Sequence, residues 1–361
     1  MLPRNAELWL PELIRARRKR PSGPPASCVD IFFCVADHFE PACGRVAFAK
    51  QVERVAAWTE RLPRLAEQFR DADGRPPQHT FFFPEEEYHP SHLDALARLC
   101  RQGFGEVEIH LHHDGDTADG LRTKIERFKA RLAHHGLLCR DRQNGQVGYA
   151  FIHGDWALDN SRRDGRLCGV NNELSILKET GCYADFTLPS APSDTQTREV
   201  NSIYRATDDP LRPKSHDRGV AVQVGRPPQG DLLMIQGPLA LDWQSRKWGV
   251  LPRVENGSLH GVNPPTARRF RLWIDAGIGV VGRPEWVFIK VYTHGAIEAN
   301  AEVLLGSAMQ RFHQEIGQLY NDGRRHRLHY VTAREMANLV YAAEAGETAD
   351  PHQLRDYRFY R

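Results

Sequence analysis

Short apolar runs alternate with amphipathic stretches along the first half of the chain. Apolar runs bounded by charged or turn-forming residues are typical of buried strands, and they lie within residues 29–41, 79–88, 106–114, 149–161 and 183–193. Between them, apolar residues recur at spacings of three and four, which predicts helices within residues 50–69, 91–104, 121–138 and 171–182. This alternation predicts βαβ units, a parallel sheet and an α/β fold.

The middle of the chain interrupts the alternation. Residues 190–260 are rich in Pro, Gly, Ser and Asp and contain only short apolar pieces, so we predict an insertion made of loops and a β-hairpin. The alternation then returns. We expect a helix within residues 266–278, a strand within 285–296 and one long helix over 300–321. A final strand and helix follow within residues 328–346.

Both ends of the chain differ from this pattern. Residues 1–27 combine an amphipathic stretch with a Pro-rich segment, which predicts a lead-in helix and a linker. We therefore expect one α/β domain over residues 28–345, with the insertion at about 190–260, and a C-terminal tail over residues 346–361.

Residues able to act as acids, bases or metal ligands follow the predicted strands. The segment EVEIHLHHDGD, residues 106–116, places Glu106, Glu108, His110 and His112 on one face of a strand. Three imidazoles and an aspartate lie within residues 110–114, which favours a metal or catalytic site. Other predicted strands end in Asp37, His38, His153, Asp155, Trp156, Asp185 and His294. Ligands bind at the carboxyl ends of parallel strands in α/β folds, so we predict one site at that edge of the sheet.

Composition excludes several classes of partner. The 361 residues carry a net charge of +2, which gives no argument for binding nucleic acid or an anionic membrane. No stretch reaches the roughly 18 apolar residues of a membrane span, and the N-terminal residues lack the features of a secretory signal. The seven cysteines are scattered without a CxxC pair, which is typical of reduced thiols. We expect a cytoplasmic protein that binds neither nucleic acid nor membrane.

Four of these strand ends resemble the motifs of the polysaccharide deacetylase family, the NodB-homology carbohydrate esterases. VDIFFCVADHFEP ends in Asp37-His38, where the family has an Asp pair. EVEIHLHHD has Glu106 and His110 at the family's spacing, with Asp114 where a second His is usual. FIHGDWALDNS lies where the third motif falls, and FIKVYTHGA supplies the late His294.

The resemblance implies a distorted (β/α) barrel of about seven parallel strands and a divalent metal. It implies Asp37 as general base and His294 as general acid, with metal ligands among His38, His110, His112 and Asp114. A second assignment makes Asp37 itself a ligand, with His110 and either His112 or His113. Residues that would contact the substrate are His153, Asp155, Trp156 and Asp185, since an aromatic wall suits a pyranose ring. The mixed donor set suits Zn²⁺ first, with Fe, Ni or Co as alternatives.

The implied activity is removal of an N-acetyl group from a sugar of a polysaccharide or its precursor. The same fold could instead hydrolyse another non-peptide C–N bond in a small molecule. A non-catalytic carbohydrate-binding protein is the third hypothesis, because the residues of both metal motifs depart from the family's pattern.

Overall fold

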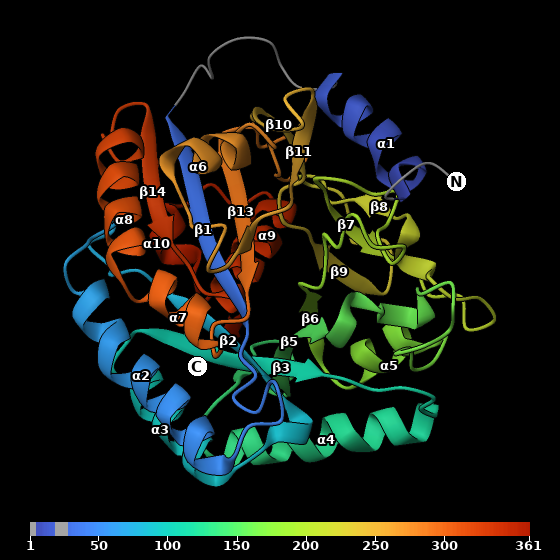
Figure 1. Ribbon diagram of the computed structural model, residues 1–361. Coiled ribbons are helices and arrows are strands. Elements are labelled where there is room, and N and C mark those ends of the chain that lie inside the picture. The colour runs from blue at the N-terminus through green and yellow to red at the C-terminus, as the bar shows by residue number, and fades with distance from the viewer. Residues whose placement is uncertain (1–4, 19–27) are drawn as a thin grey trace.

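The computed structural model describes residues 5–18 and 28–361, so most of the predicted linker lies outside the described residues (Figure 1). Helix α1 (Ala6–Arg18) occupies the predicted lead-in helix. Its apolar side chains Leu8, Trp9 and Leu13 pack in a small cluster with Val200 and Leu239. The N-terminal helix is thus joined to the central part of the chain by burial of apolar surface.

A large, mostly parallel sheet forms the centre of the molecule. Its strands follow the order β12-β13-β1-β2-β3-β5-β6-β9-β7-β8, and β14 also pairs with β1. Pairings from β12 to β9 along this path are parallel, whereas β7 is antiparallel to both β9 and β8. The strands of the path, with β14, are β1 (Val29–His38), β2 (His79–Pro84), β3 (Gly105–Leu111), β5 (Val147–His153), β6 (Cys182–Asp185), β7 (Ile203–Ala206), β8 (Val220–Ala221), β9 (Leu232–Ile235), β12 (Ser258–Leu259), β13 (Trp286–Thr293) and β14 (His326–Tyr330).

Helices cover both faces of this sheet. The helices after α1 are α2 (Phe48–Ala66), α3 (Pro90–Arg101), α4 (Ala118–His134), α5 (Glu173–Glu179), α6 (Ala267–Ile274), α7 (Glu298–Leu304), α8 (Ser307–Tyr320), α9 (Ala333–Ala345) and α10 (Pro351–Leu354). One face, which we call the outer face, packs against α2 to α8. The other, the α9 face, packs against α9 and α10.

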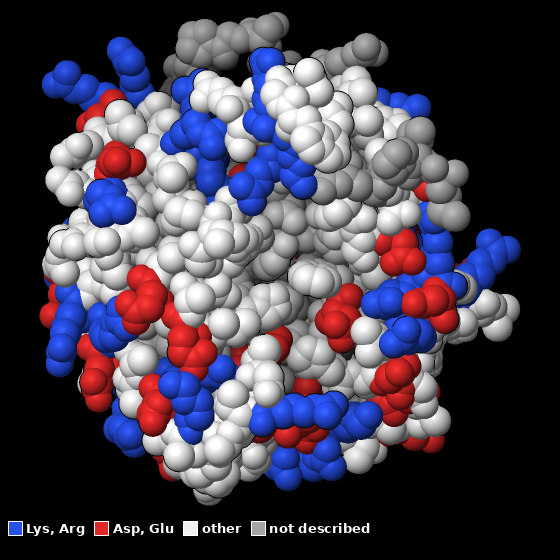
Figure 2. Space-filling model, in the orientation of Figure 1, with Lys and Arg blue, Asp and Glu red and all other residues white. Residues whose placement is uncertain are grey.

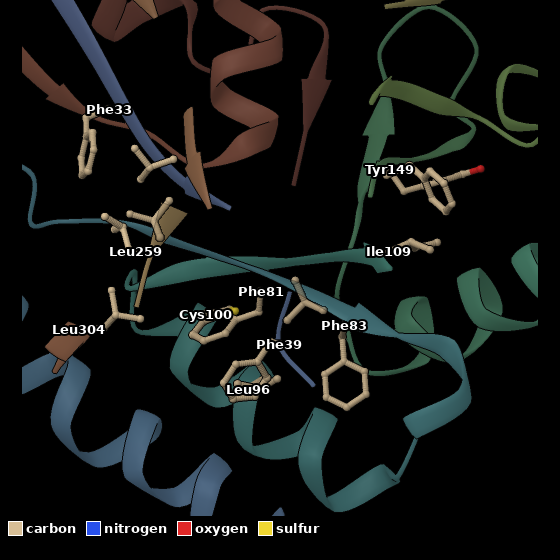
Figure 3. Close-up of a cluster of buried hydrophobic side chains, with 14 of the residues drawn as sticks. Phe33, Phe39, Phe81, Phe83, Leu96, Cys100, Ile109, Tyr149, Leu259 and Leu304 are labelled. Atoms are coloured by element: carbon tan, nitrogen blue, oxygen red, sulfur yellow. The ribbon is translucent and has the colours of Figure 1, made fainter. Parts of the chain in front are cut away.

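Alternation along each strand divides the core between the two faces. In β1, Ile31, Phe33 and Val35 belong to the outer cluster, while Phe32 and Cys34 belong to the cluster around α9. Figure 3 shows part of the outer cluster, where side chains of neighbouring strands meet those of the helices. Both faces of the strands are buried, as expected for parallel strands covered by helices.

The sheet does not close into a hydrogen-bonded barrel within the described residues. The second edge of β9 pairs with β7, and β7 pairs with β8, so the ladder ends at β8 and does not return to β12 or β13. The gap is crossed by a side chain: Lys290 on β13 donates from Nζ to the carbonyls of Phe186, at 2.7 Å, and Leu188, at 2.6 Å. The structure therefore confirms the α/β class and the parallel sheet but shows no closed barrel.

The central region contributes more to the sheet than the sequence indicated. Within the predicted insertion, β9 pairs in parallel with β6 and extends the main sheet. The hairpin is formed by β10 (Ala240–Lys247) and β11 (Leu251–Glu255), which make a separate two-stranded sheet among the described strands. Loops and a hairpin thus account for part of residues 190–260.

Two predictions near the C-terminus also change. The long helix expected over 300–321 is divided into α7 and α8, which meet at Gly306. A Cβ on Gly306 would lie 2.3 Å from the carbonyl oxygen of Glu302, so the chain approaches itself closely at this junction. The predicted tail contains β15 (Phe359–Tyr360), which pairs antiparallel with β4 (Cys139–Asp141).

Among the helices of the described residues, none is both long and apolar enough to cross a lipid bilayer.

Candidate functional site

A group of histidines gathers where β1, β3 and β13 end. His38 closes β1, His110 lies in β3, and His112 and His294 follow β3 and β13. The ring centroid of His38 lies 4.9 Å from that of His110 and 4.7 Å from that of His294, and the centroids of His110 and His112 are 4.5 Å apart. Four imidazoles from three strand ends therefore share one small volume.

The carboxylate of Glu40 lies among these imidazoles. Its Oε1 is 3.3 Å from Nε2 of His110, 3.8 Å from Nε2 of His112 and 3.9 Å from Nε2 of His294. Glu40 was not among the predicted site residues. Alternation extended two residues past His38 would have found it on the same face.

Strand alternation explains why these side chains meet. Glu106 and Glu108 lie lower on the same face of β3, where Glu106 binds Arg334 of α9 at 2.8 Å and Glu108 accepts a hydrogen bond from the hydroxyl of Tyr183. His110 and His112 follow on this face, nearer the carboxyl end of the strand. The acids of EVEIHLHHDGD thus bind partners in the core, and the imidazoles form the site.

Outer partners fix the orientation of two imidazoles. Nδ1 of His110 donates to the carbonyl of Ile152 at 2.8 Å, which leaves the lone pair of Nε2 facing Glu40. Nδ1 of His112 is hydrogen-bonded to the carboxylate of Glu86. Metal-binding histidines commonly have such carbonyl or carboxylate partners on the other ring nitrogen.

The electrostatics favour neutral imidazoles beside an ionised Glu40. Burial, reinforced by the nearby imidazoles of His294 and His110, lowers the pKa of His38 well below its usual value. Burial also lowers the pKa of His294. Burial opposes ionisation of Glu40, yet its contacts with the surrounding imidazoles, of which His110 is the nearest, bring its pKa below the usual value. Neutral imidazoles and a carboxylate are the forms that bind a cation.

In contrast to His38 and His294, His112 has a raised pKa. Burial disfavours its charged form, but the hydrogen bond to Glu86 and the charges of Glu86, Glu40 and Asp155 raise its pKa to about 9. Its partner Glu86 correspondingly has a lowered pKa despite burial. His112 is thus held as an imidazolium at neutral pH, paired with a carboxylate.

One side of the group is open to solvent, and an aromatic side chain borders it. The side chains of His112 and His294 are 34% and 31% exposed, whereas that of His110 is fully buried. The Trp156 ring lies 6.2 Å from His38 and 6.3 Å from His294, and its Nε1 has no hydrogen-bond partner among the described residues. Figure 2 shows a hollow near the middle of one molecular face, bordered largely by residues other than Lys, Arg, Asp and Glu.

Asp37, predicted as general base or ligand, lies on the opposite face of β1 from His38. It is fully buried, and its two oxygens already have partners. Oδ1 accepts from the amide of Gly295 at 2.6 Å, and Oδ2 is 2.9 Å from Nε2 of His79. Asp37 thus holds the turn after His294 in place, and it does not face the histidine group.

Three further predicted residues lie away from the histidine group. His153 points to the outer face, where its Nε2 is 2.8 Å from Nε2 of His113. Both oxygens of Asp185 accept hydrogen bonds from Thr187, and burial raises the pKa of this carboxyl to about 6. Asp114 is exposed and accepts a hydrogen bond from the amide of Leu167 at 3.0 Å.

Within residues 5–18 and 28–361, three sets of side chains could hold a metal ion, because each offers three ligand atoms within 4.8 Å of one another. The first is His38, Glu40 and His110, and the second is His113, His153 and Glu173. The third, Asp71, Asp73 and His329, is occupied by protein partners: Arg355 binds Asp73 at 2.5 Å, and His329 also contacts Asp30 at 2.9 Å. The first set is the one best suited to a metal that substrate can reach, because a hydrogen bond orients His110 and the neighbouring His112 and His294 are partly exposed.

Comparison with known proteins gives no family for this chain. No family model matches it, and no curated protein matches it. A crystal structure of a "putative glycoside hydrolase/deacetylase" from Parabacteroides distasonis is similar over 90% of this chain and 73% of that chain, with 10% identity and a TM-score of 0.47. A likeness this remote carries no argument about the fold or the function.

The partners that support the site could not be predicted from the sequence. Glu86 belongs to a run of three acids after β2, a pattern that is also typical of a helix N-terminus. Glu173 begins α5, twenty residues after His153, and only the folded chain brings the two together.

Proposed function

We propose that the protein is a metal-dependent hydrolase that removes an N-acetyl group from a sugar of a polysaccharide or its precursor. The observation that supports this proposal is the convergence of His38, Glu40 and His110, two of them fully or almost fully buried, beside the partly exposed His112 and His294. Closed donor sets are typical of structural metal sites, whereas catalytic sites keep one side open to water and substrate.

His38, Glu40 and His110 would hold the metal. Two imidazoles and a carboxylate suit Zn²⁺, and Fe, Ni or Co use the same donors. A bound divalent metal polarises a carbonyl and lowers the pKa of bound water from near 16 to about 7. The protein's part is to keep Nε2 of His110 free of its own proton, which the hydrogen bond from Nδ1 to Ile152 does.

His294 and His112 would move the protons. His294 is partly exposed and has no hydrogen-bonded carboxylate partner among the described contacts, so it suits accepting a proton from the attacking water. Glu86 stabilises the protonated ring of His112, so His112 suits donating a proton to the leaving amine. This assignment replaces the predicted base Asp37, whose oxygens already have protein partners, and gives His294 the base role.

The aromatic side chains would bind the sugar. The rings of Trp156 and Tyr292 lie 6.1 Å apart and almost perpendicular, next to His38. The apolar face of a pyranose packs well on such a ring. The proposal includes no nucleic acid or membrane partner, and a cytoplasmic location stays a prediction.

Product analysis of the zinc-loaded full chain tests the proposal. Incubation with a panel of N-acetylated hexosamine oligomers should release acetate, and His110→Asn should reduce the rate at least ~10³-fold because a ligand is lost. Release of ammonia from a small-molecule panel without acetate would favour hydrolysis of another C–N bond. Sugar binding without release of either product would favour the non-catalytic hypothesis.

A substrate with a better leaving group tests the two proton roles separately. We expect His112→Gln and His294→Gln each to lower kcat for the N-acetyl sugar by about 10²–10⁴-fold. An aryl acetate needs little protonation of its leaving group, so the loss should shrink for His112→Gln and persist for His294→Gln. The reverse pattern would return the acid role to His294.

A further inference from the structure

A second histidine pair is buried on the outer face of the sheet, behind the candidate active site. His113 follows β3 and His153 closes β5, and their Nε2 atoms are 2.8 Å apart. The carboxylate of Glu173, at the start of α5, completes the group with Oε1 3.3 Å from Nε2 of His113 and 3.6 Å from Nε2 of His153. All three side chains are fully buried.

The other ring nitrogen of each histidine is already a donor. Nδ1 of His153 contacts the carbonyl oxygen of Gly154, which can only accept. Nδ1 of His113 lies 3.0 Å from Oδ2 of Asp116, and this oxygen also accepts from Nζ of Lys124 at 2.7 Å. With both Nδ1 atoms protonated, neutral imidazoles would turn the lone pairs of their two Nε2 atoms toward each other.

Glu173 adds a third electron-rich atom to the same point. Its Oε2 accepts from the amide of Asp159 at 2.6 Å. Its Oε1 is fully buried and has no hydrogen-bond partner among the described residues, although it faces both Nε2 atoms. A buried carboxylate oxygen without a hydrogen-bond donor is costly unless a cation satisfies it.

The spacing of the three atoms matches one cation. Ligands of a tetrahedral zinc ion at bond lengths of 2.0–2.1 Å lie about 3.3–3.4 Å apart. The three separations here are 2.8, 3.3 and 3.6 Å. We propose that His113, His153 and Glu173 bind a structural Zn²⁺ ion, separate from the metal of the open site and on the other face of the sheet.

Such an ion would hold the segment between β5 and α5. This segment carries Trp156, and two of its glycines fit closely against histidine rings. A Cβ on Gly169 would lie 1.9 Å from Cε1 of His113, and one on Gly154 would lie 2.2 Å from Cδ2 of His112. Fixing His113 and His153 to α5 therefore supports His112 and Trp156 through the backbone of this segment.

Zinc stoichiometry in matched variants of the full chain tests this proposal. Each protein is stripped with a chelator, reloaded with Zn²⁺, dialysed and measured by elemental analysis. A variant of the open site, Glu40→Gln with His110→Asn, should retain one equivalent of zinc. Adding Glu173→Gln and His153→Asn to that variant should reduce its zinc at least tenfold. His313→Asn, which removes another buried histidine whose partner is Tyr330, should leave the zinc content of the native chain unchanged.

Two results would overturn the proposal, and neither depends on whether the quadruple variant folds. The first is a folded Glu40→Gln, His110→Asn variant that holds no zinc after reloading. The second is an NMR spectrum of that reloaded variant in which His113 and His153 share a proton at Nε2, since a hydrogen bond would then take the place of the ion. Both measurements are independent of the proposed hydrolase activity.

Discussion

At the scale of single residues, the site depends on glycines that let other groups come close. Gly295 follows His294, and a Cβ there would lie 2.1 Å from Oδ2 of Asp37 and 2.6 Å from the ring of Trp58. A side chain at position 295 would therefore break the hydrogen bond from the amide of Gly295 to Asp37 and shift the turn that carries His294.

Gly295→Ala should therefore impair both stability and activity. We expect a loss of about 1–3 kcal/mol in the free energy of unfolding, as for other overpacked positions, and a lower kcat. Gly317→Ala is the matched control, because Gly317 lies in α8 and a Cβ added there would have nothing within 4 Å, so this change should be neutral or stabilising by up to about 1 kcal/mol. Denaturant unfolding measures both variants, and an unchanged Gly295→Ala protein would contradict the close approach.

Glu108 gives a prediction for the dependence of stability on pH. Burial, reinforced by the charge of Glu106, raises the pKa of Glu108 to about 8, whereas in the unfolded chain it is near 4.3. The folded state therefore binds more protons than the unfolded state between these values, and stability falls as pH rises from about 4.5 to 8.

Glu108→Gln should remove this loss. The variant should be more stable than the native chain at pH 8, by about 1–3 kcal/mol, with the difference shrinking toward pH 5. Glu106→Gln, on the same face of β3, should instead destabilise, because it weakens the ion pair with Arg334. Thermal unfolding at pH 5 and pH 8 measures the stability of both variants. Equal stabilisation by Glu108→Gln at the two pH values would contradict the raised pKa of Glu108.

At the scale of elements, the alternation of residues along strands predicted which side chains meet in the site better than the motif resemblance did. Apolar runs located β1, β2, β3, β5, β6 and β13, and alternation along β3 placed His110 and His112 on one face. The resemblance paired Asp37 with His38 as site residues, but consecutive residues of a strand point to opposite faces. That parity is why His38 lies in the site and Asp37 does not.

Elements whose partners are distant in sequence could not be predicted in this way. β9 is four residues long, and nothing in DLLMIQG shows that it pairs with β6 instead of forming a local hairpin. The second metal-binding set needs His113, His153 and Glu173 from three different elements, and each residue alone is typical of an ordinary core or cap position.

Lys290 links β13 to the segment after β6, which share no backbone ladder in the part of the chain that the structure describes. Its ammonium donates to the carbonyls of Phe186 and Leu188, so it holds β13 to the segment after β6. Lys290→Met keeps most of the volume and leaves both carbonyls without that donor. We expect a loss of about 1–3 kcal/mol in the free energy of unfolding and faster amide exchange around residues 186–189, whereas unchanged exchange there would show that the lysine is not a link.

At the scale of the whole molecule, the fold places polar chemistry at one edge of a sheet whose faces are both covered. The α/β class and the parallel sheet could be predicted from the alternation of elements, because apolar residues recur at one spacing in strands and at another in helices. Whether the sheet closes into a barrel could not be predicted, because closure depends on which strand pairs with the free edge of β9. In this structure that strand is β7. The site at the carboxyl ends of β1, β3 and β13 does not require a closed barrel.

Anomalous diffraction from a crystal of the full chain loaded with Zn²⁺, recorded on both sides of the zinc absorption edge, would show whether His38, Glu40 and His110 bind the metal. We expect a zinc peak within bonding distance of Nε2 of His110, an oxygen of Glu40 and the ring of His38, with a water or substrate atom on the exposed side. Loaded crystals with no peak between these three side chains would contradict it.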